Sequence, residues 1–160
     1  MLHRPAQLGG VGERWLAGLS ALVAELESQW SITVGDVLDG GTGSFVATAT
    51  TARGDSAVLK IAIPTGEFPA VVDVAAQIDT LARAGGRGYV GLLAHDADRR
   101  AMLLEGLGPS LGRLGWSPER QIDILCRTLR EAWQVPRSER SVFDPTEEKA
   151  TLLGSWIEAA

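Results

Sequence analysis

The spacing of hydrophobic residues predicts a helix near the start of the chain. Trp15, Leu19, Leu22 and Leu26 recur at three- and four-residue intervals, so they would line one face of an amphipathic helix. This pattern ends near Trp30.

Three segments after this helix have the composition of strands. Glycine-containing turns at residues 40–43 and 53–55 separate them. We expect an antiparallel meander formed by residues 32–38, 44–52 and 56–63.

A second helix and two further strands follow the meander. Two prolines and a glycine between residues 64 and 69 end the strand pattern, and residues 71–84 then read as a helix. This helix stops at the glycine-rich segment 85–88. A polar turn at 96–100 joins the last two predicted strands, which are residues 89–94 and 101–105.

The last third of the chain reads as helical. Ser117 precedes a proline, a typical helix start, and the periodicity continues over residues 117–135. A further helix is predicted over 145–158, after Asp144. The sequence therefore predicts an α+β architecture with a lobe over residues 1–105, a hinge or linker over 106–115 and a helical segment over 116–160.

Composition and charge narrow the class of protein. The chain has 160 residues, 45% hydrophobic and 22% charged, which is typical of a water-soluble globular protein. It has no apolar run of the roughly 20 residues that a membrane helix needs, and its N-terminus does not read as a secretory signal. Cys126 is the single cysteine, so no internal disulfide is possible and a cytoplasmic location is expected. The net charge of −5 argues against nucleic-acid binding and suits a cationic small molecule.

A glycine-rich segment, Gly40-Gly41-Thr42-Gly43-Ser44, is the first candidate for a binding loop. Backbone N–H groups of such loops can approach a phosphate closely because no side chain intervenes. The segment joins two predicted strands and lacks the Lys-Ser/Thr ending of a P-loop, so an ordinary hairpin turn remains the alternative.

Lys60 is the second candidate. Only two of the 15 basic residues are lysines, and Lys60 lies in the middle of the apolar segment 57–63. A lysine in such a strand needs an anionic partner to offset its desolvation, unless its side chain extends to the edge of the apolar region.

Several segments occur in an order that matches a known architecture: the opening helix with Trp30, residues 40–44, 57–61 and 85–90, Ala-Met-Leu-Leu-Glu at 101–105, Gly-Pro-Ser-Leu at 108–111, and 125–133. In this order the chain resembles a protein-kinase-like small lobe followed by the first helices of the large lobe. More closely, it resembles the aminoglycoside and hydroxyurea antibiotic-resistance kinases, the streptomycin phosphotransferase type of the aminoglycoside phosphotransferase superfamily. The resemblance covers nearly the whole chain.

The resemblance implies transfer of phosphate from ATP, with magnesium, to an alcohol group of a small molecule. In the implied site Lys60 contacts the α- and β-phosphates, the glycine loop lies above them, and backbone groups of residues 105–107 bind the adenine edge. The side chain of Glu105 has either a role of its own or that of a solvated carboxylate at a strand end. The implied nucleotide-binding residues are Gly40, Gly41, Thr42, Gly43, Ser44, Lys60, Gln77, Glu105, Gly106 and Leu107.

Two positions depart from the family pattern. A glutamate on the helix after the lysine strand usually pairs with the lysine, whereas this chain has Gln77, which can accept a hydrogen bond but carries no charge. Asp73 is the alternative partner, although a first-turn aspartate is also favoured by the helix dipole alone. Gly106 replaces a usual arginine, with an effect expected on packing.

The residues that perform catalysis in this fold are not found in the sequence. Its histidines are His3 and His95, and neither begins a His-x-Asp…Asn loop. Asp96 and Asp98 look like a magnesium pair, but they precede the hinge and read as a hairpin turn. We therefore expect the N-terminal half of an enzyme, inactive alone, with the catalytic residues and the metal ligands in the other half.

Three hypotheses of different class remain open. The chain is an enzyme fragment, a non-catalytic kinase-like module that binds nucleotide or protein, or an unrelated α+β domain in which Lys60 pairs with a core carboxylate. The enzyme hypothesis gives ATP and a cationic acceptor as partners, with no nucleic acid and no membrane. Exposed apolar faces of the two C-terminal helices would favour self-association.

Overall fold

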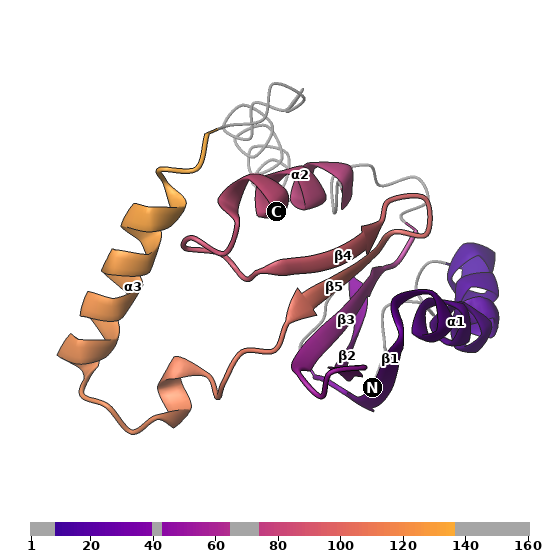
Figure 1. Ribbon diagram of the computed structural model, residues 1–160, viewed down its shortest axis with the longest axis horizontal. Helices are drawn as coiled ribbons and strands as arrows, with labels where there is room; N and C mark the ends of the chain where they lie inside the picture. The colour runs from indigo at the N-terminus through magenta and orange to yellow at the C-terminus, as the bar shows by residue number, and fades with distance from the viewer. Residues whose placement is uncertain (1–8, 40–42, 65–73, 137–160) are drawn as a thin grey trace, which may run out of the picture.

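A computed structural model describes residues 9–39, 43–64 and 74–136 of the chain (Figure 1). It confirms the predicted α+β fold, a five-stranded antiparallel sheet with an inserted helix, as in a kinase-like small lobe. In chain order the elements are α1 (Gly9–Trp30), β1 (Ile32–Val37), β2 (Ser44–Thr51), β3 (Ser56–Ala62), α2 (Val74–Ala84), β4 (Leu92–Asp96), β5 (Ala101–Glu105), the 3₁₀ turn η2 (Leu111–Arg113) and α3 (Pro118–Ala132).

The strand order in the sheet is β1-β2-β3-β5-β4, and every neighbouring pair is antiparallel. The predicted meander of the first three strands is confirmed, and β3 is the central strand. In the register of the sheet, Lys60 lies opposite Val46 on β2 and Met102 on β5. The sequence thus places its one strand lysine in the middle of the sheet.

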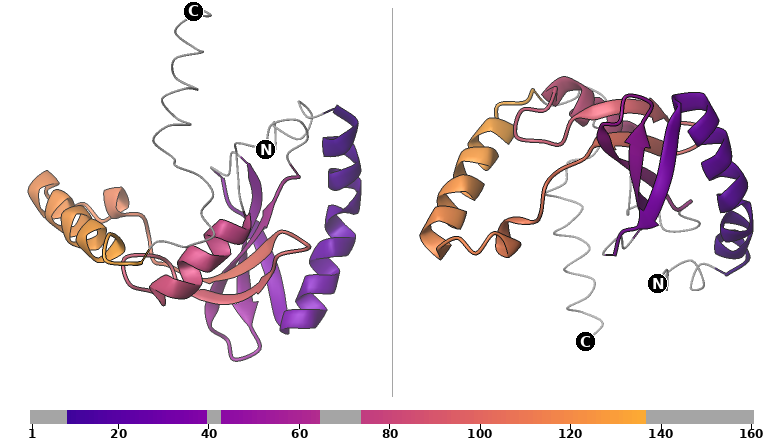
Figure 2. Two further views of the ribbon diagram at one scale, coloured as in Figure 1. Left: turned by 90° about the horizontal axis from the view of Figure 1, so that it is seen from above. Right: turned by 60° about the horizontal axis from the view of Figure 1, so that its bottom comes forward.

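Helix α1 covers one face of the sheet (Figure 2). Side chains alternate between the faces of a strand, so Leu59 and Ile61 point to the same face, and both are fully buried. They pack with Leu26 of α1 and with partly buried residues of the same helix, among them Trp15 and Leu22. Burying a leucine or isoleucine contributes about 1.5–3 kcal/mol, so this cluster holds α1 on the sheet.

Helix α2 covers part of the opposite face. Val74 and Ile78 of α2 are buried against Met102 and Ala62, with Leu104 partly buried beside them. Lys60 belongs to this face because it alternates with Leu59 and Ile61. The apolar face of α2 therefore packs on the side of the sheet that carries the lysine.

The largest difference from the predicted elements is in β4, expected over 89–94 and found at Leu92–Asp96. Gly88 has a φ of +68°, and the chain passes along α3 here, so residues 89–91 do not join the regular ladder. At the other end the turn is short: Arg99 N–H donates to Asp96 Oδ1 at 2.9 Å, and Asp96 closes the strand opposite Ala101.

Helix α3 stands apart from the sheet and meets the rest of the structure near its C-terminal end (Figures 1 and 2). A Cβ built on Gly88 would lie 2.8 Å from the Cα of Ala132, so backbone packs directly on backbone. One stripe of α3, continued by its C-cap Trp133, is apolar and exposed, with Ile122 at 59% and Trp133 at 76%. The helix predicted over 145–158 lies outside the described residues. None of the described helices is long and apolar enough to cross a membrane.

Candidate functional site

Lys60 and Gln77 meet between β3 and α2. Lys60 Nζ donates a hydrogen bond to Gln77 Oε1 at 3.0 Å, and both side chains are half-buried. Gln77 is on the face of α2 that turns to the sheet, next to the buried Ile78. The predicted approach of the lysine to the helix at Gln77 is confirmed, while Asp73, the alternative partner, lies outside the described residues.

The electrostatics of this pair differ from those of a salt bridge. Partial burial lowers the pKa of the Lys60 ammonium, because it removes water from the charged form. The amide of Gln77 offers a lone pair and no negative charge, so it only partly replaces that water. An anionic ligand within reach of Nζ would supply the missing charge.

A cavity of about 350 Å³ adjoins the pair, between α2 and β5. Its polar end is formed by Lys60 and Gln77, and apolar side chains from α2, β5 and the segment before β4 line the rest. A charged end with an apolar body suits a ligand that has both an anionic group and an apolar part. The residues that line it are Lys60, Ala76, Gln77, Thr80, Leu81, Tyr89, Val90, Met102 and Leu104.

The sequence reasoning missed the residues of this cavity outside the pair. Alternation along β5 was the available signal for two of them: Met102 lies opposite Lys60, so Met102 and Leu104 must share the face of the lysine. Tyr89 and Val90 carried no such signal, because their position depends on the path of an irregular segment.

The glycine-rich loop is only partly described. Gly40, Gly41 and Thr42 lie outside the described residues, whereas Gly43 and Ser44 are anchored beside β3. The carbonyl of Gly43 accepts the N–H of Ile63 at 3.0 Å, and the buried Ser44 lies opposite Ala62. The end of the loop is therefore attached to the same strand as Lys60. Contact between Lys60 and the underside of the loop stays a prediction.

The strand end at Glu105 is held by three hydrogen bonds, each 2.9 Å long. Glu105 N–H donates to the carbonyl of Gly91, and the Gly91 N–H donates to Oε1 of the Glu105 carboxylate. Gly106 N–H donates to the carbonyl of Ser56. Of the two alternatives for Glu105, the solvated carboxylate is wrong, because the side chain is half-buried and bonded to the neighbouring segment.

The packing around Gly106 explains why this position is a glycine. A Cβ there would overlap the hydroxyl of Ser56 and lie 2.6 Å from its Cβ. The expected effect on packing is thus present at the start of β3. Leu107, the next residue, is 69% exposed.

The pair Asp96 and Asp98 forms a turn, as predicted. Arg99 donates to the Asp96 carboxylate from its backbone N–H and from its guanidinium, and the backbone bond is the first cause that lowers the pKa of Asp96. The same guanidinium also reaches Glu25 of α1 at 3.1 Å. Within the described residues no three His, Cys, Asp or Glu side chains gather as a metal site, so we assign no metal-holding role to them.

Comparison with known proteins gives two related sequences and no matching family model. The chain is 31% identical to a streptomycin 6-kinase of Streptomyces glaucescens, over 94% of the chain and 53% of the relative. It is 36% identical to a streptomycin 6-kinase of Streptomyces griseus, over 64% of the chain and 31% of the relative. The chain thus spans about half the length, or less, of the curated relatives that it matches.

Proposed function

We propose that this chain, homologous to an N-terminal part of the aminoglycoside phosphotransferases, is the ATP-binding half of a small-molecule O-phosphotransferase. The observation that carries the proposal is the hydrogen bond between Lys60 and Gln77 at the polar end of the cavity. Among the described residues that contact it, the Lys60 ammonium has no charged partner. It lies where a phosphate could approach it.

Each part of the site has a role in holding the nucleotide. The Lys60 ammonium binds the α- and β-phosphates, and Gln77 orients it by accepting one of its three N–H groups. Backbone N–H groups of residues 40–44 lie over the phosphates, and backbone groups of residues 105–107 bind the adenine edge. ATP, when bound, supplies the phosphoryl group. The chain contributes to orienting and neutralising it.

Catalysis needs groups beyond these. An aspartate that orients the acceptor hydroxyl and side chains that hold magnesium belong to a His-x-Asp…Asn loop and a later Asp motif in this fold. The sequence contains neither motif. We propose that they are supplied by a second half and that these 160 residues alone do not turn over.

The acceptor is proposed from the relatives and from charge. Both relatives are named streptomycin 6-kinase, and the net charge of −5 suits a cationic acceptor. An aminoglycoside alcohol, phosphorylated in the cytoplasm as a means of antibiotic resistance, is therefore the proposed substrate class. Neither nucleic acid nor a membrane is a proposed partner.

A second candidate function is a non-catalytic kinase-like module that binds nucleotide or a protein. It is favoured by Gln77, because an amide aims the lysine less firmly than the usual glutamate does. Activity measured with the second half present distinguishes the two. Metal-dependent phosphorylation of streptomycin by the combined halves supports the enzyme, and nucleotide binding without turnover supports the module.

The exposed stripe of α3, formed by Ile122, Leu125, Leu129 and Trp133, supports a further proposal of self-association. Sedimentation velocity of the chain over a range of concentrations tests it. A mass that rises with concentration, and falls back in Trp133→Glu, is the expected result. A monomer at every concentration would contradict it.

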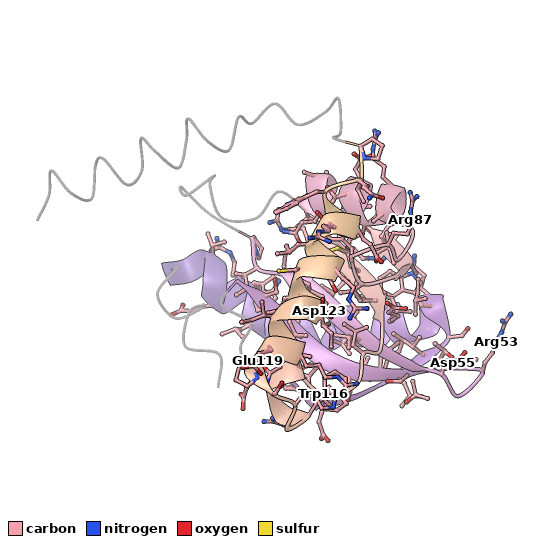
Figure 3. All side chains as sticks on the ribbon, turned by 90° about the vertical axis from the view of Figure 1, so that its left-hand side faces the viewer. Arg53, Asp55, Arg87, Trp116, Glu119 and Asp123 are labelled. Atoms are coloured by element: carbon pink, nitrogen blue, oxygen red, sulfur yellow. The ribbon has the colours of Figure 1, made fainter. Side chains whose placement is uncertain are left out.

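Nucleotide binding is tested by titrating the ¹⁵N-labelled chain with ATP and following amide shifts, which detect weak binding. Lys60→Ala should lower the affinity roughly tenfold, because it removes a charge-assisted contact to phosphate. Arg53→Ala is the matched control for the lost charge, since Arg53 lies exposed at the tip of the β2–β3 turn (Figure 3). Equal ATP affinity in all three chains would favour the unrelated α+β domain.

A further inference from the structure

The hydrogen bonds between Gly91 and Glu105 depart from a regular antiparallel ladder. Opposite residues in a hydrogen-bonded position exchange two bonds, each N–H donating to the main-chain oxygen of the other. Glu105 N–H makes the first bond, to Gly91 O at 2.9 Å. The return bond from Gly91 N–H goes to the carboxylate Oε1 of Glu105 instead, also at 2.9 Å.

Because the carboxylate accepts the Gly91 N–H, the main-chain oxygen of Glu105 is left available. In the described ranges, 9–39, 43–64 and 74–136, no donor is hydrogen-bonded to that oxygen. The orientation of its peptide group is nevertheless fixed, because Gly106 N–H donates to Ser56 O on β3. In a planar trans peptide the C=O points opposite to the N–H, so the oxygen of Glu105 points away from β3.

We propose that Glu105 is a positioning residue: its carboxylate takes the Gly91 N–H and thereby keeps its own main-chain oxygen free to accept a hydrogen bond from the nucleotide base. The inference rests on the proposed function, since it concerns how an ATP-binding half recognises adenine. The carboxylate itself does not touch the ligand. It acts through the backbone, at the end of the strand whose Leu104 lines the cavity.

The free oxygen determines which base is accepted. The exocyclic amino group of adenine donates to a carbonyl, whereas hypoxanthine has an oxygen at that position, which is repelled. Without the carboxylate, the partly buried Gly91 N–H would turn to the main-chain oxygen of residue 105, its partner in a regular ladder, because an N–H without a partner is costly. The base would then compete with Gly91 for one oxygen.

The test compares ATP with inosine triphosphate, which differs only in the base, on the full 160-residue chain. Glu105→Ala should lower the preference for ATP over inosine triphosphate roughly fivefold, the effect of one hydrogen bond. Glu105→Gln should retain the wild-type preference, since its side-chain oxygen accepts the same N–H. Glu131→Ala, an exposed carboxylate on α3, is the control and should also retain it.

The outcomes separate this inference from the proposed function. If the wild-type chain prefers ATP and Glu105→Ala keeps that preference, the positioning role is wrong and nucleotide binding stands. If the wild-type chain binds neither nucleotide, the proposed function fails, and the positioning role with it. Should Glu105→Ala not fold, Glu105→Asp takes its place: the shorter side chain should lose the preference that Glu105→Gln keeps, and the reverse order would overturn the inference.

Discussion

Gln77 Oε1 accepts a hydrogen bond from Lys60 Nζ at 3.0 Å, so an uncharged amide on α2 is the partner of the lysine on the central strand. A carboxylate in this place would neutralise the ammonium, whereas the amide only solvates it. Burial accordingly lowers the pKa of Lys60. The site keeps a positive charge that an anionic ligand can use.

The lowered pKa of Lys60 makes stability depend on pH on the alkaline side. Between its pKa in the folded chain and its ordinary value of 10.5, the unfolded chain binds more protons than the folded one. The contribution of Lys60 to the free energy of unfolding should therefore increase as pH rises through this window. Lys60→Met should remove this increase. Urea unfolding across the window measures both chains. If the plots of unfolding free energy against pH stay parallel for the two chains, this prediction is contradicted.

A charged partner should reverse the behaviour of the lysine. Gln77→Glu should raise the pKa of Lys60 and increase the free energy of unfolding at neutral pH by about 1 kcal/mol, through a charge-assisted hydrogen bond. Gln77→Leu should cost about 1–2 kcal/mol, because it leaves the ammonium without its acceptor. Gln134→Glu, on the exposed end segment after α3, controls for the added charge. A gain of equal size in the control would refute the pairing.

Two glycines of one loop separate backbone strain from the contact with α3. Gly86 and Gly88 both have positive φ, +83° and +68°, but a Cβ on Gly86 meets nothing within 4 Å, whereas one on Gly88 meets the backbone of α3. Gly86→Ala should cost about 1 kcal/mol from φ alone. Gly88→Ala should cost more and displace α3, which an environment-sensitive dye on the exposed Cys126 reports. The same dye signal in both variants would exclude the contact.

The packing of α1 on the sheet gives a prediction for the core. Leu59 is fully buried in the cluster that includes Leu26, so Leu59→Ala should destabilise the chain by about 2–5 kcal/mol. Val37→Ala, at a strand position that is 55% exposed, should change stability by less than about 0.5 kcal/mol. Chemical unfolding of the two variants measures the difference. Similar losses would mean that α1 does not seal this face.

The β4–β5 turn should contribute to stability at neutral pH and lose that contribution in acid. Hydrogen bonds from Arg99 lower the pKa of Asp96 below its ordinary value of 3.8. The stabilisation is present above 3.8 and is lost as pH falls through the lowered pKa. Asp96→Asn should flatten the acid side of the stability profile, whereas Asp98→Asn, on the exposed turn, should not. An unchanged profile in Asp96→Asn is the contrary result.

Local patterns in the sequence determined the order of the elements and the placement of the lysine. The apolar spacing of α1, the glycine turns and the alternating segments act over a few residues, so they can be read without the fold. The order of these segments also carried the family resemblance, and with it the expectation that Gln77 or Asp73 meets Lys60, of which the structure shows Gln77.

Only the tertiary structure decided what surrounds that pair. The start of β4 at Leu92 depends on how the preceding segment passes α3, and no local pattern contains that contact. The carboxylate of Glu105 finds Gly91, 14 residues away, because the pairing of β4 with β5 brings the two together. The sequence by itself thus determined the order of the elements and the strand that carries the lysine. The register of the sheet and the packing of the helices decided which of them meet, since those contacts join residues far apart in the chain.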